Sequence, residues 1–527
     1  MVAIRVEPTT LATRPLQTAG VGRDLPIRMF NGQMAMLDAQ GASRPYLIEA
    51  IPQLNTDSWR LLPDGRMETT YKLRPNVLWQ DGTPLASEDF VFGWRVYATP
   101  ALGHSGLPPF NAMEEVVAPD SRTVLVRWKQ AYPDVSFVAS FAEFPPLPRH
   151  ILSEAHRPEQ LEAFTNHPYW NRDYVGLGPY RLSQWEPGAF VEGTAVDSHA
   201  WGRAKIDRVR LNFANDPNAV LARIIAGDIH LSDGSSLGLA QAAVLRKDWV
   251  ASGSGNVLLQ PSQWLAAHFQ HRPELADPKV ILNPTFRKAL AHAVDKTGFN
   301  ETLYDGMGIP TDSLVAPTSI WGLAADRGAA KYPFDLRRTD QLVQELGYRK
   351  GGDGVYASAT DGRLTFEVKT HAGKDNEAEV AVVAGAWRQA GFDTQEFVLP
   401  ATQGQDPEKR ATFAGAYTNG QNCCESAIVG FTSSSIPTAE TRWSGPNRTG
   451  WSNAQYDRLA DVFSKTLDAT ERESQVTELV RLHTENIESV SLFIRPSAWV
   501  HASSLRGLVL APPEGNMSWN LHEWTLQ

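Results

Sequence analysis

A strand–helix–strand pattern near the middle of the chain is the feature that most restricts its fold. Residues 207–213 alternate polar and apolar side chains, which predicts a strand. Asp216-Pro217 then gives the preferred order of an N-cap and a first helical residue, and Gly227 follows the apolar positions of the expected helix. A second strand is expected at 228–231. Units of this kind build parallel sheets, so the pattern predicts an α/β fold.

Length and composition narrow the possible classes of protein. The chain has 527 residues, which is two to four domains at roughly 100–200 residues each. Its 42% hydrophobic and 20% charged residues exclude an intrinsically disordered chain. No apolar run approaches roughly 18 residues, so no membrane-spanning helix is expected. The formal charge of −10, from 49 basic and 59 acidic residues without a long basic run, argues against a nucleic-acid-binding protein.

Strands and helices alternate over the rest of the sequence. Further strands are expected at 2–6, 69–73, 116–128 (a hairpin), 180–185, 265–269, 364–368, 490–494 and 506–510. Further helices are expected after an N-cap at Ser87, after Asn283-Pro284, and at 239–245, 341–346, 378–390, 456–467 and 472–487.

The only two cysteines are adjacent, Cys423 and Cys424. This excludes a disulfide framework and a cysteine-based zinc site. A vicinal disulfide and two reduced, buried thiols both fit this spacing, and we expect the thiols because a disulfide between neighbours is strained. Residues 1–8 lack the features of a signal peptide, so we expect either a cytosolic protein or a mature form without its signal.

Several segments resemble, in chain order, the family 5 solute-binding proteins of ABC transporters, the oligopeptide-, dipeptide- and nickel-binding type. The most specific segment is YKLRPNVLWQDGTPLASEDFVF at residues 71–92. The others are EPTTL at 7–11, VGLGPY at 175–180, AGDI at 226–229, FRKALAHAVD at 286–295 and GWSNAQYD at 450–457. Within these motifs we expect structural roles: Trp79, Asp81-Gly82 and Ser87 in a strand–turn–helix corner, and Arg287 and Asp295 in ion pairs on a helix surface.

The resemblance implies a two-lobed, periplasmic-binding-protein-like fold (Venus flytrap, type II) with an additional inserted small domain. One lobe would be discontinuous, from 1–45, 170–260 and 495–527, with the small domain at 46–169. The other lobe would be 261–494, with a hinge near residues 260 and 494.

The resemblance also implies an extracytoplasmic protein, either periplasmic or lipid-anchored at the outer face of the cytoplasmic membrane, whose signal segment is absent from this chain. It would capture a peptide or peptide-like solute by lobe closure and deliver it to a membrane ABC permease. We expect a monomer that catalyses no reaction and needs no cofactor.

The ligand site is expected on loops between the lobes. In peptide-binding members, an acidic residue in a W-x-x-D-type segment holds the peptide's amino terminus. The corresponding window, 417–425, lacks that Trp and Asp, so an oligosaccharide or another non-peptide solute stays open as an alternative. The candidate ligand-binding residues are those of this window, together with aromatic and loop residues that offer stacking surface: Tyr417, Thr418, Asn419, Cys424, Glu425, Phe30, Asn31, Trp264 and Trp443.

Two other motifs offer different chemistry. Residues 234–238 match G-x-S-x-G, which would make Ser236 the nucleophile of a serine hydrolase with Asp457 and His483 as partners. His268 and His271 form an H-x-x-H pair, but on a strand they point to opposite faces, so no metal site is expected.

Overall fold

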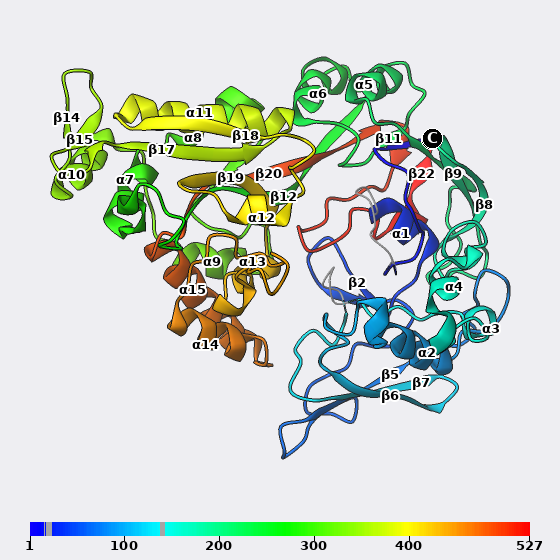
Figure 1. Ribbon diagram of the computed structural model, residues 1–527. Helices are drawn as coiled ribbons and strands as arrows, with labels where there is room; N and C mark the ends of the chain where they lie inside the picture. The colour runs from blue at the N-terminus through cyan, green and yellow to red at the C-terminus, as the bar shows by residue number, and fades with distance from the viewer. Residues whose placement is uncertain (15, 17–23, 138–142) are drawn as a thin grey trace. The chain divides into compact units, whose positions relative to one another are not determined.

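The chain divides into two units, drawn as ribbons in Figure 1. The structure, a computed structural model, describes residues 1–14, 16, 24–137 and 143–527. Unit 1 consists of Met1–Gln260 and Ser497–Gln527, and unit 2 is Pro261–Pro496. The chain passes from one unit to the other within two long strands, β12 (Gly255–Phe269) and β20 (Ser489–Ala502).

Unit 1 contains the predicted β-α-β pattern. Strand β10 (Arg208–Phe213) leads into helix α5 (Pro217–Ile225), which Asp216 caps through its side chain. The second strand, β11 (Leu231–Ser232), is shorter than expected. Strand β1 (Val2–Ile4) lies between β10 and β11 and pairs with both in parallel. The sheet of unit 1 is therefore organised around the first strand of the chain.

A second sheet of unit 1 has four strands in the order β4 (Trp59–Leu61), β5 (Met67–Lys72), β7 (Thr123–Trp128) and β6 (Met113–Asp120). The predicted hairpin is confirmed as its antiparallel pair β6 and β7. Helix α2 (Ser87–Tyr97) packs against this sheet (Figure 1). The N-cap prediction was wrong by one position, because Ala86 is the cap and its N–H donates to Asp89 Oδ2 at 3.0 Å. Trp79 is buried and donates to the same carboxylate, as its expected structural role requires.

The remaining elements of unit 1 are α1 (Asp24–Phe30), β2 (Ala35–Leu37), β3 (Ser43–Pro45), β4 (Trp59–Leu61), β5 (Met67–Lys72), β6 (Met113–Asp120), β7 (Thr123–Trp128), α3 (Arg149–Leu152), α4 (Leu161–Thr165), β8 (Tyr180–Glu186), β9 (Phe190–Ala195), α6 (Leu239–Val244), β21 (Leu505–Arg506) and β22 (Thr525–Leu526). The strand expected at 506–510 was wrong, because only Leu505 and Arg506 pair, with β22.

Unit 2 is built on the strand order β18-β17-β19-β12-β20. Helix α11 packs on one face of the sheet, and α9, α13, α14 and α15 cover the other (Figure 1). The second face carries a core of Trp264, Phe431, Trp451, Val476 and Leu479, all nearly inaccessible to solvent. The apolar positions that predicted α15 thus fill the space between helix and sheet.

The elements of unit 2 are α7 (Pro284–His292), α8 (Lys296–Tyr304), β13 (Ile309–Pro310), α9 (Gly322–Gly328), α10 (Leu336–Glu345), β14 (Arg349–Lys350), β15 (Tyr356–Ser358), β16 (Gly362–Arg363), β17 (Thr365–His371), α11 (Lys374–Ala390), β18 (Asp393–Leu399), α12 (Pro407–Ala411), β19 (Ala416–Asn422), α13 (Glu425–Val429), α14 (Ala454–Phe463) and α15 (Ala469–Glu485). Within the described ranges, no helix of either unit has both the length and the apolar character needed to cross a bilayer.

Two motif residues on α7 and before α8 differ from their predicted roles. Arg287 is buried rather than on the surface, and it donates to the carbonyls of Ile487, Ile281 and Asn486 at 2.8–2.9 Å. Asp295 caps α8 by accepting from Gly298 N–H at 3.0 Å. The periodicity of a short helix does not reveal that a guanidinium is needed to satisfy loop carbonyls behind it.

Candidate functional site

Strand β19 carries the first part of the predicted ligand window into the middle of the unit 2 sheet. It pairs antiparallel with β12 and parallel with β17. The Tyr417 side chain is 2% exposed and packs on Leu399 and Phe413. Its ring is stacked with His371, the last residue of β17, and His371 Nδ1 lies 3.0 Å from Tyr417 Oη. The sheet therefore fixes both rings from adjacent strands.

The tautomer of His371 follows from its second hydrogen bond. Asn376 Nδ2 donates to His371 Nε2 at 3.1 Å, so Nε2 accepts and Nδ1 carries the proton. His371 Nδ1 then donates to Tyr417 Oη, which leaves the phenol hydrogen of Tyr417 available for another acceptor. Burial lowers the pKa of His371, and the charges of Arg410 and Arg448 lower it further. The imidazole is therefore neutral at pH 7.

Two half-buried arginines face this pair of rings. Arg410 lies on α12, which Asp406 caps by accepting from Glu408 N–H and Lys409 N–H at 3.0 and 3.2 Å. Arg448 lies on the loop before α14, where Arg272 Nη1 donates to its carbonyl at 2.8 Å. The short helix α12 and the loop before α14 thus bring together two cations that are distant in the sequence.

Neither arginine is neutralised. Among the described residues, no carboxylate lies within 4.0 Å of a side-chain nitrogen of Arg410 or Arg448. Arg410 Nε is buried without a hydrogen-bond partner in the described structure. Burial and the charge of Arg410 lower the pKa of Arg448 from 12.5 to about 10. Burial raises the pKa of Tyr417, while both arginine charges oppose that increase. The four side chains therefore share one electrostatic environment with an excess of positive charge.

We call Arg410, Arg448, Tyr417 and His371 the arginine site. Its available groups are N–H and O–H donors, and its charge is positive. Arginine side chains hold planar oxyanions such as carboxylates through charge-assisted hydrogen bonds. An unpaired buried charge is costly and a bound anion removes that cost. The arrangement is suited to binding an anionic group of a ligand.

The rest of the predicted window has other partners. Thr418 is buried, and its hydroxyl donates to the Lys369 carbonyl at 3.4 Å, while Asn419 follows it on the same strand. Glu425 begins α13 and accepts from Arg472 Nη2 and from Trp321 Nε1, both at 3.0 Å. Its charge is thus compensated by the protein, and its role in holding an amino group stays a prediction.

The aromatic and loop candidates lie in both units. Trp264 is completely buried on β12, opposite Gln421, and donates to Ser491 Oγ at 3.0 Å. Trp443 is half-buried in a turn of unit 2. Phe30 and Asn31 are buried in unit 1, where the Asn31 amide donates to the Leu11 and Ile27 carbonyls at 2.6 and 3.0 Å. These contacts fix the positions of the side chains in the units, and contact with a ligand stays a prediction for each.

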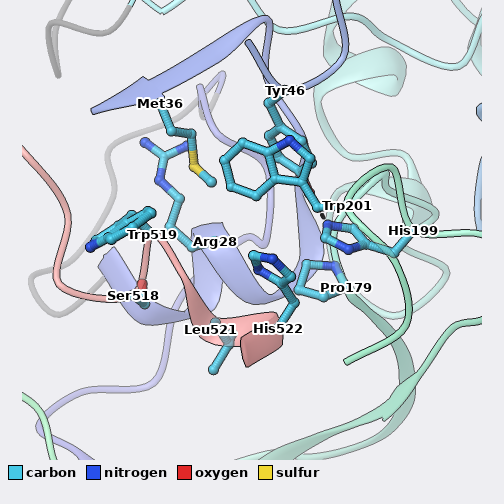
Figure 2. A pocket seen from close by; sticks show the side chains of 10 residues that line it. All are labelled: Arg28, Met36, Tyr46, Pro179, His199, Trp201, Ser518, Trp519, Leu521 and His522. Carbon is cyan, nitrogen blue, oxygen red and sulfur yellow. Dashed lines mark hydrogen bonds between the residues drawn. The ribbon is translucent and has the colours of Figure 1, made fainter. Parts of the chain in front are cut away.

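Unit 1 has a small aromatic pocket of its own. Figure 2 shows its walls, which are Arg28, Met36, Tyr46, Pro179, His199, Trp201, Ser518, Trp519, Leu521 and His522. Its volume of about 10 Å³ is far below the roughly 300–1,000 Å³ of typical small-molecule sites. The pocket as it stands has room for about one water molecule and not for part of a solute.

Hydrogen bonds hold one wall of this pocket rigid. His199 Nδ1 lies 2.8 Å from the Gly202 carbonyl and donates to it, so Nε2 accepts from the Tyr46 hydroxyl at 2.5 Å. Burial lowers the pKa of His199 to about 4, so the ring is neutral at pH 7. Trp201 packs against Tyr46 with ring centroids 4.6 Å apart. The wall is therefore apolar and uncharged.

The hydrolase alternative does not fit the structure. Ser236 is 2% exposed, and its hydroxyl lies 3.1 Å from the Ala3 carbonyl and 2.7 Å from Ser232 Oγ. Asp457 accepts from the backbone and hydroxyl of Ser433, and His483 pairs with Glu488. None of the three expected triad members contacts another, so the motif match is a buried turn.

The histidine pair is likewise structural. His268 is buried and faces Glu488, and His271 lies after the end of β12. In the described part of the chain, no group of three or more metal-ligating side chains is arranged to hold a metal ion.

Two units built on α/β sheets and joined by two long strands are the architecture of a periplasmic-type binding protein. The sequence assigns the chain to one family of such proteins. Residues 49–422, more than half of the chain, match the profile of the bacterial extracellular solute-binding proteins, family 5 (middle). The chain belongs to this family, and the resemblance seen in its motifs is confirmed. It is accordingly a solute-binding protein by family.

Related proteins agree with this assignment. The oligopeptide-binding protein AppA of Bacillus subtilis is 24% identical over 61% of this chain and 56% of its own length. Protein XP55 of Streptomyces lividans is 26% identical over 75% of this chain and 66% of its own length. Relatives from Brucella match over 51% of their length. The matched part thus spans about half to two thirds of these relatives.

Solved structures share the fold. AppA of Bacillus subtilis in complex with a nonapeptide superposes with a TM-score of 0.72 at 19% identity, covering 100% of this chain and 98% of that one. NikZ of Campylobacter jejuni in complex with Ni(L-His) gives 0.76 at 19% identity, covering 99% and 98%. The two-lobed fold predicted from the sequence is therefore confirmed.

Sequence reasoning missed most of the arginine site. It identified Tyr417, but Arg410, Arg448 and His371 are isolated polar residues in segments without a motif. One weak signal was available: Arg410 directly follows a capped turn, and Arg448 lies just before the GWSNAQYD segment. The pairing of β17 with β19 brings His371 beside Tyr417, and α12 and the loop before α14 add the two arginines.

Proposed function

We propose that this chain is the extracytoplasmic solute-binding component of an ABC importer, and that its solute is a peptide or peptide-like molecule with a carboxylate. The observation that carries the proposal is the pair of unneutralised arginines beside Tyr417. A neutral oligosaccharide would leave both charges unpaired, whereas a carboxylate would satisfy them. The peptide-binding name of AppA and the nonapeptide in its solved complex support a peptide-type solute.

Each residue of the arginine site has a distinct part in binding. Arg410 and Arg448 supply charge and N–H donors, and the phenol hydrogen of Tyr417 supplies one more donor. His371 does not carry charge at pH 7, and it acts by holding the Tyr417 oxygen. Without solute the two guanidinium groups repel each other, so the site favours an anion over any neutral group of similar size.

Capture would proceed by closure of a discontinuous lobe (1–45, 170–260 and 495–527, with the small domain 46–169) on the lobe of residues 261–494. The hinge would lie near residues 260 and 494, where the long strands β12 and β20 carry the chain across. Closure needs a solute that binds the closed form better than the open form, because differential affinity is its only driving force. The closed protein, a monomer, would then dock on a membrane permease.

The proposed location is outside the cytoplasm, in the periplasm or lipid-anchored at the outer face of the cytoplasmic membrane. The family consists of extracellular proteins, which supports this location. The net charge of −10 supports the absence of nucleic-acid partners.

Isothermal titration of the full chain with di- to octapeptides, each with a free or an amidated C-terminus, tests the proposal. Hydrogen bonds to charged groups contribute about 1.5–3 kcal/mol, so amidation should weaken binding roughly 10- to 150-fold. Arg448→Met should weaken binding of the free acid by a similar factor and leave the amide unchanged. Arg442→Met, an exposed arginine of the same unit, is the matched control and should change neither.

Two results would contradict the proposal. Equal affinity for acid and amide would show that no carboxylate is held. Tight binding of a neutral oligosaccharide that survives Arg448→Met would show that the solute is of another class.

A further inference from the structure

The adjacent cysteines form a dithiol at the junction between β19 and α13. Cys423 follows the last residue of the strand, and Cys424 is the N-cap of the helix. Both side chains are buried, at 5% and 7% exposure, and both are thiols in the structure. Their sulfur atoms are 2.9 Å apart. The two thiols therefore point toward each other rather than to opposite sides of the chain.

The backbone at Cys424 has a conformation that side chains disfavour. Its φ of 77° and ψ of −155° lie in a region that is almost exclusive to glycine. The surrounding packing maintains it: both cysteines belong to the core cluster with Ile428 and Phe431, and the Cys424 carbonyl accepts from Ala427 N–H at 3.1 Å. Strained residues of this kind concentrate at functional positions. This conformation keeps the two sulfur atoms on the same side.

We propose that Cys423 and Cys424 are a redox-active dithiol that closes reversibly to a vicinal disulfide by exchange with a small external disulfide. One cysteine thiolate attacks a sulfur of the external disulfide and releases one thiol. The second thiolate then attacks the mixed disulfide, forms the Cys423–Cys424 bond and releases the second thiol. The external disulfide is reduced to two thiols, which take up the two protons that the cysteines lose.

The chemistry of neighbouring cysteines makes this bond reversible. Consecutive Cα atoms are about 3.8 Å apart, whereas ordinary disulfides join Cα atoms about 4.4–6.8 Å apart. A disulfide outside that range is more easily reduced. The bond also encloses no intervening residues, so it adds little of the loop-closure stabilisation of a structural disulfide. The two cysteines are therefore suited to reversible oxidation and not to stabilising the fold.

The position of the pair determines what its oxidation changes. Ring closure fixes the peptide bond between the strand that carries Tyr417 and the helix that begins with Glu425. Glu425 holds Arg472 and Trp321 by hydrogen bonds, so the redox state acts on the anchoring of α13 to α15 and α9. Cys423 Sγ also lies 3.6 Å from the Ser262 carbonyl of β12, and both thiols are buried, so exchange requires a local opening of this junction.

The test uses the full chain treated with oxidised glutathione, acid-quenched, unfolded and alkylated, with intact mass as the readout. We expect the mass of the protein to fall by two hydrogen atoms and no alkyl group to be added. Treatment with dithiothreitol should restore two alkylatable thiols. Cys423→Ser and Cys424→Ser should each retain a single glutathione instead, because the second attack is lost.

Three outcomes would overturn the proposal: two alkyl groups on the oxidant-treated chain, a persistent mixed disulfide on the wild type, or a disulfide-linked dimer. A second pair of variants tests the geometry without redox chemistry. Cys424→Gly should unfold at a higher temperature than Cys424→Ser, because glycine adopts the observed φ and ψ freely. Equal stability of these two variants would show that the backbone does not hold the sulfur atoms together. The proposal is independent of the solute.

Discussion

The buried carboxylate of Glu488 provides the sharpest test of how unit 2 is held together. Its Oε1 lies 3.4 Å from His268 Nδ1 and its Oε2 lies 3.1 Å from His483 Nε2. Glu488 is 0% exposed, and the two imidazoles are 3% and 2% exposed. Burial alone would raise the pKa of Glu488, but the two histidines outweigh burial and hold it well below 4.5. The carboxylate is therefore ionised and stabilised by both rings.

Glu488→Gln keeps the shape of the side chain and removes the charge. Removing one partner of a buried ion pair costs about 3–5 kcal/mol. Neither contact has hydrogen-bond geometry, and both carboxylate oxygens are buried without a hydrogen-bond partner in the described structure, so we expect the lower end, about 3 kcal/mol. At roughly 2–4 °C per kcal/mol for a unit of this size, the unfolding midpoint should fall by about 6–12 °C.

The assay is thermal and urea unfolding followed by tryptophan fluorescence, since Trp264 packs beside both histidines and Trp451 beside His483. Glu473→Gln is the control, because Glu473 forms an exposed ion pair with Arg327 at 3.5 Å and should contribute less than about 1 kcal/mol. The pKa of Glu488 is lowered in the folded state, so its stabilisation is complete above about pH 4.5 and is lost as pH falls through the folded pKa. The two proteins should therefore converge in acid. A loss below about 0.5 kcal/mol at pH 7 would refute this account.

Three further predictions concern other buried polar groups. His199 has a folded pKa of about 4 against 6.5 unfolded, so stability should fall as pH drops from 6.5 to about 4, by up to about 1.4 kcal/mol per pH unit, and His199→Gln should flatten that slope in urea unfolding. Arg287→Met leaves three carbonyls without a donor and should cost at least about 3 kcal/mol by the same measurement; a loss under 1 kcal/mol would contradict it. Ser236→Ala should cost about 1 kcal/mol and leave solute affinity unchanged, whereas loss of an esterase activity in this variant would revive the hydrolase hypothesis.

Local signals predicted those parts of the fold that local interactions determine. Asp216 before α5 and Asn283 before α7 cap their helices as expected, because an N-cap side chain bonds to backbone only two residues away. The hairpin of β6 and β7 was predicted for the same reason. Ser87 shows the limit of the method, since Asp89 provides the bond that selects Ala86 as the cap.

The site depends on contacts that local sequence does not contain. Tyr417 was identified from a family window, but its proposed role depends on His371, 46 positions earlier, and on two arginines, one on α12 and one on the loop before α14. The spacing of apolar residues shows which face of a helix or strand is buried. It does not show which residues from distant parts of the sequence will lie beside that element. The surface ion pair predicted for Arg287 was wrong for the same reason, because two of the three carbonyls that it satisfies lie about 200 residues away.

The division of unit 1 into two stretches of sequence sets an order for folding during synthesis. Residues 261–496 are continuous, so unit 2 has all of its strands once Pro496 has left the ribosome. Unit 1 still lacks Ser497–Gln527 at that time, including the part of β20 that pairs with β11 through Val500 and His501. At roughly 5–20 residues per second, residues 1–260 of unit 1 wait many seconds for the rest of their sheet. During that interval the open edge of β11 is available to chaperones or to other nascent chains.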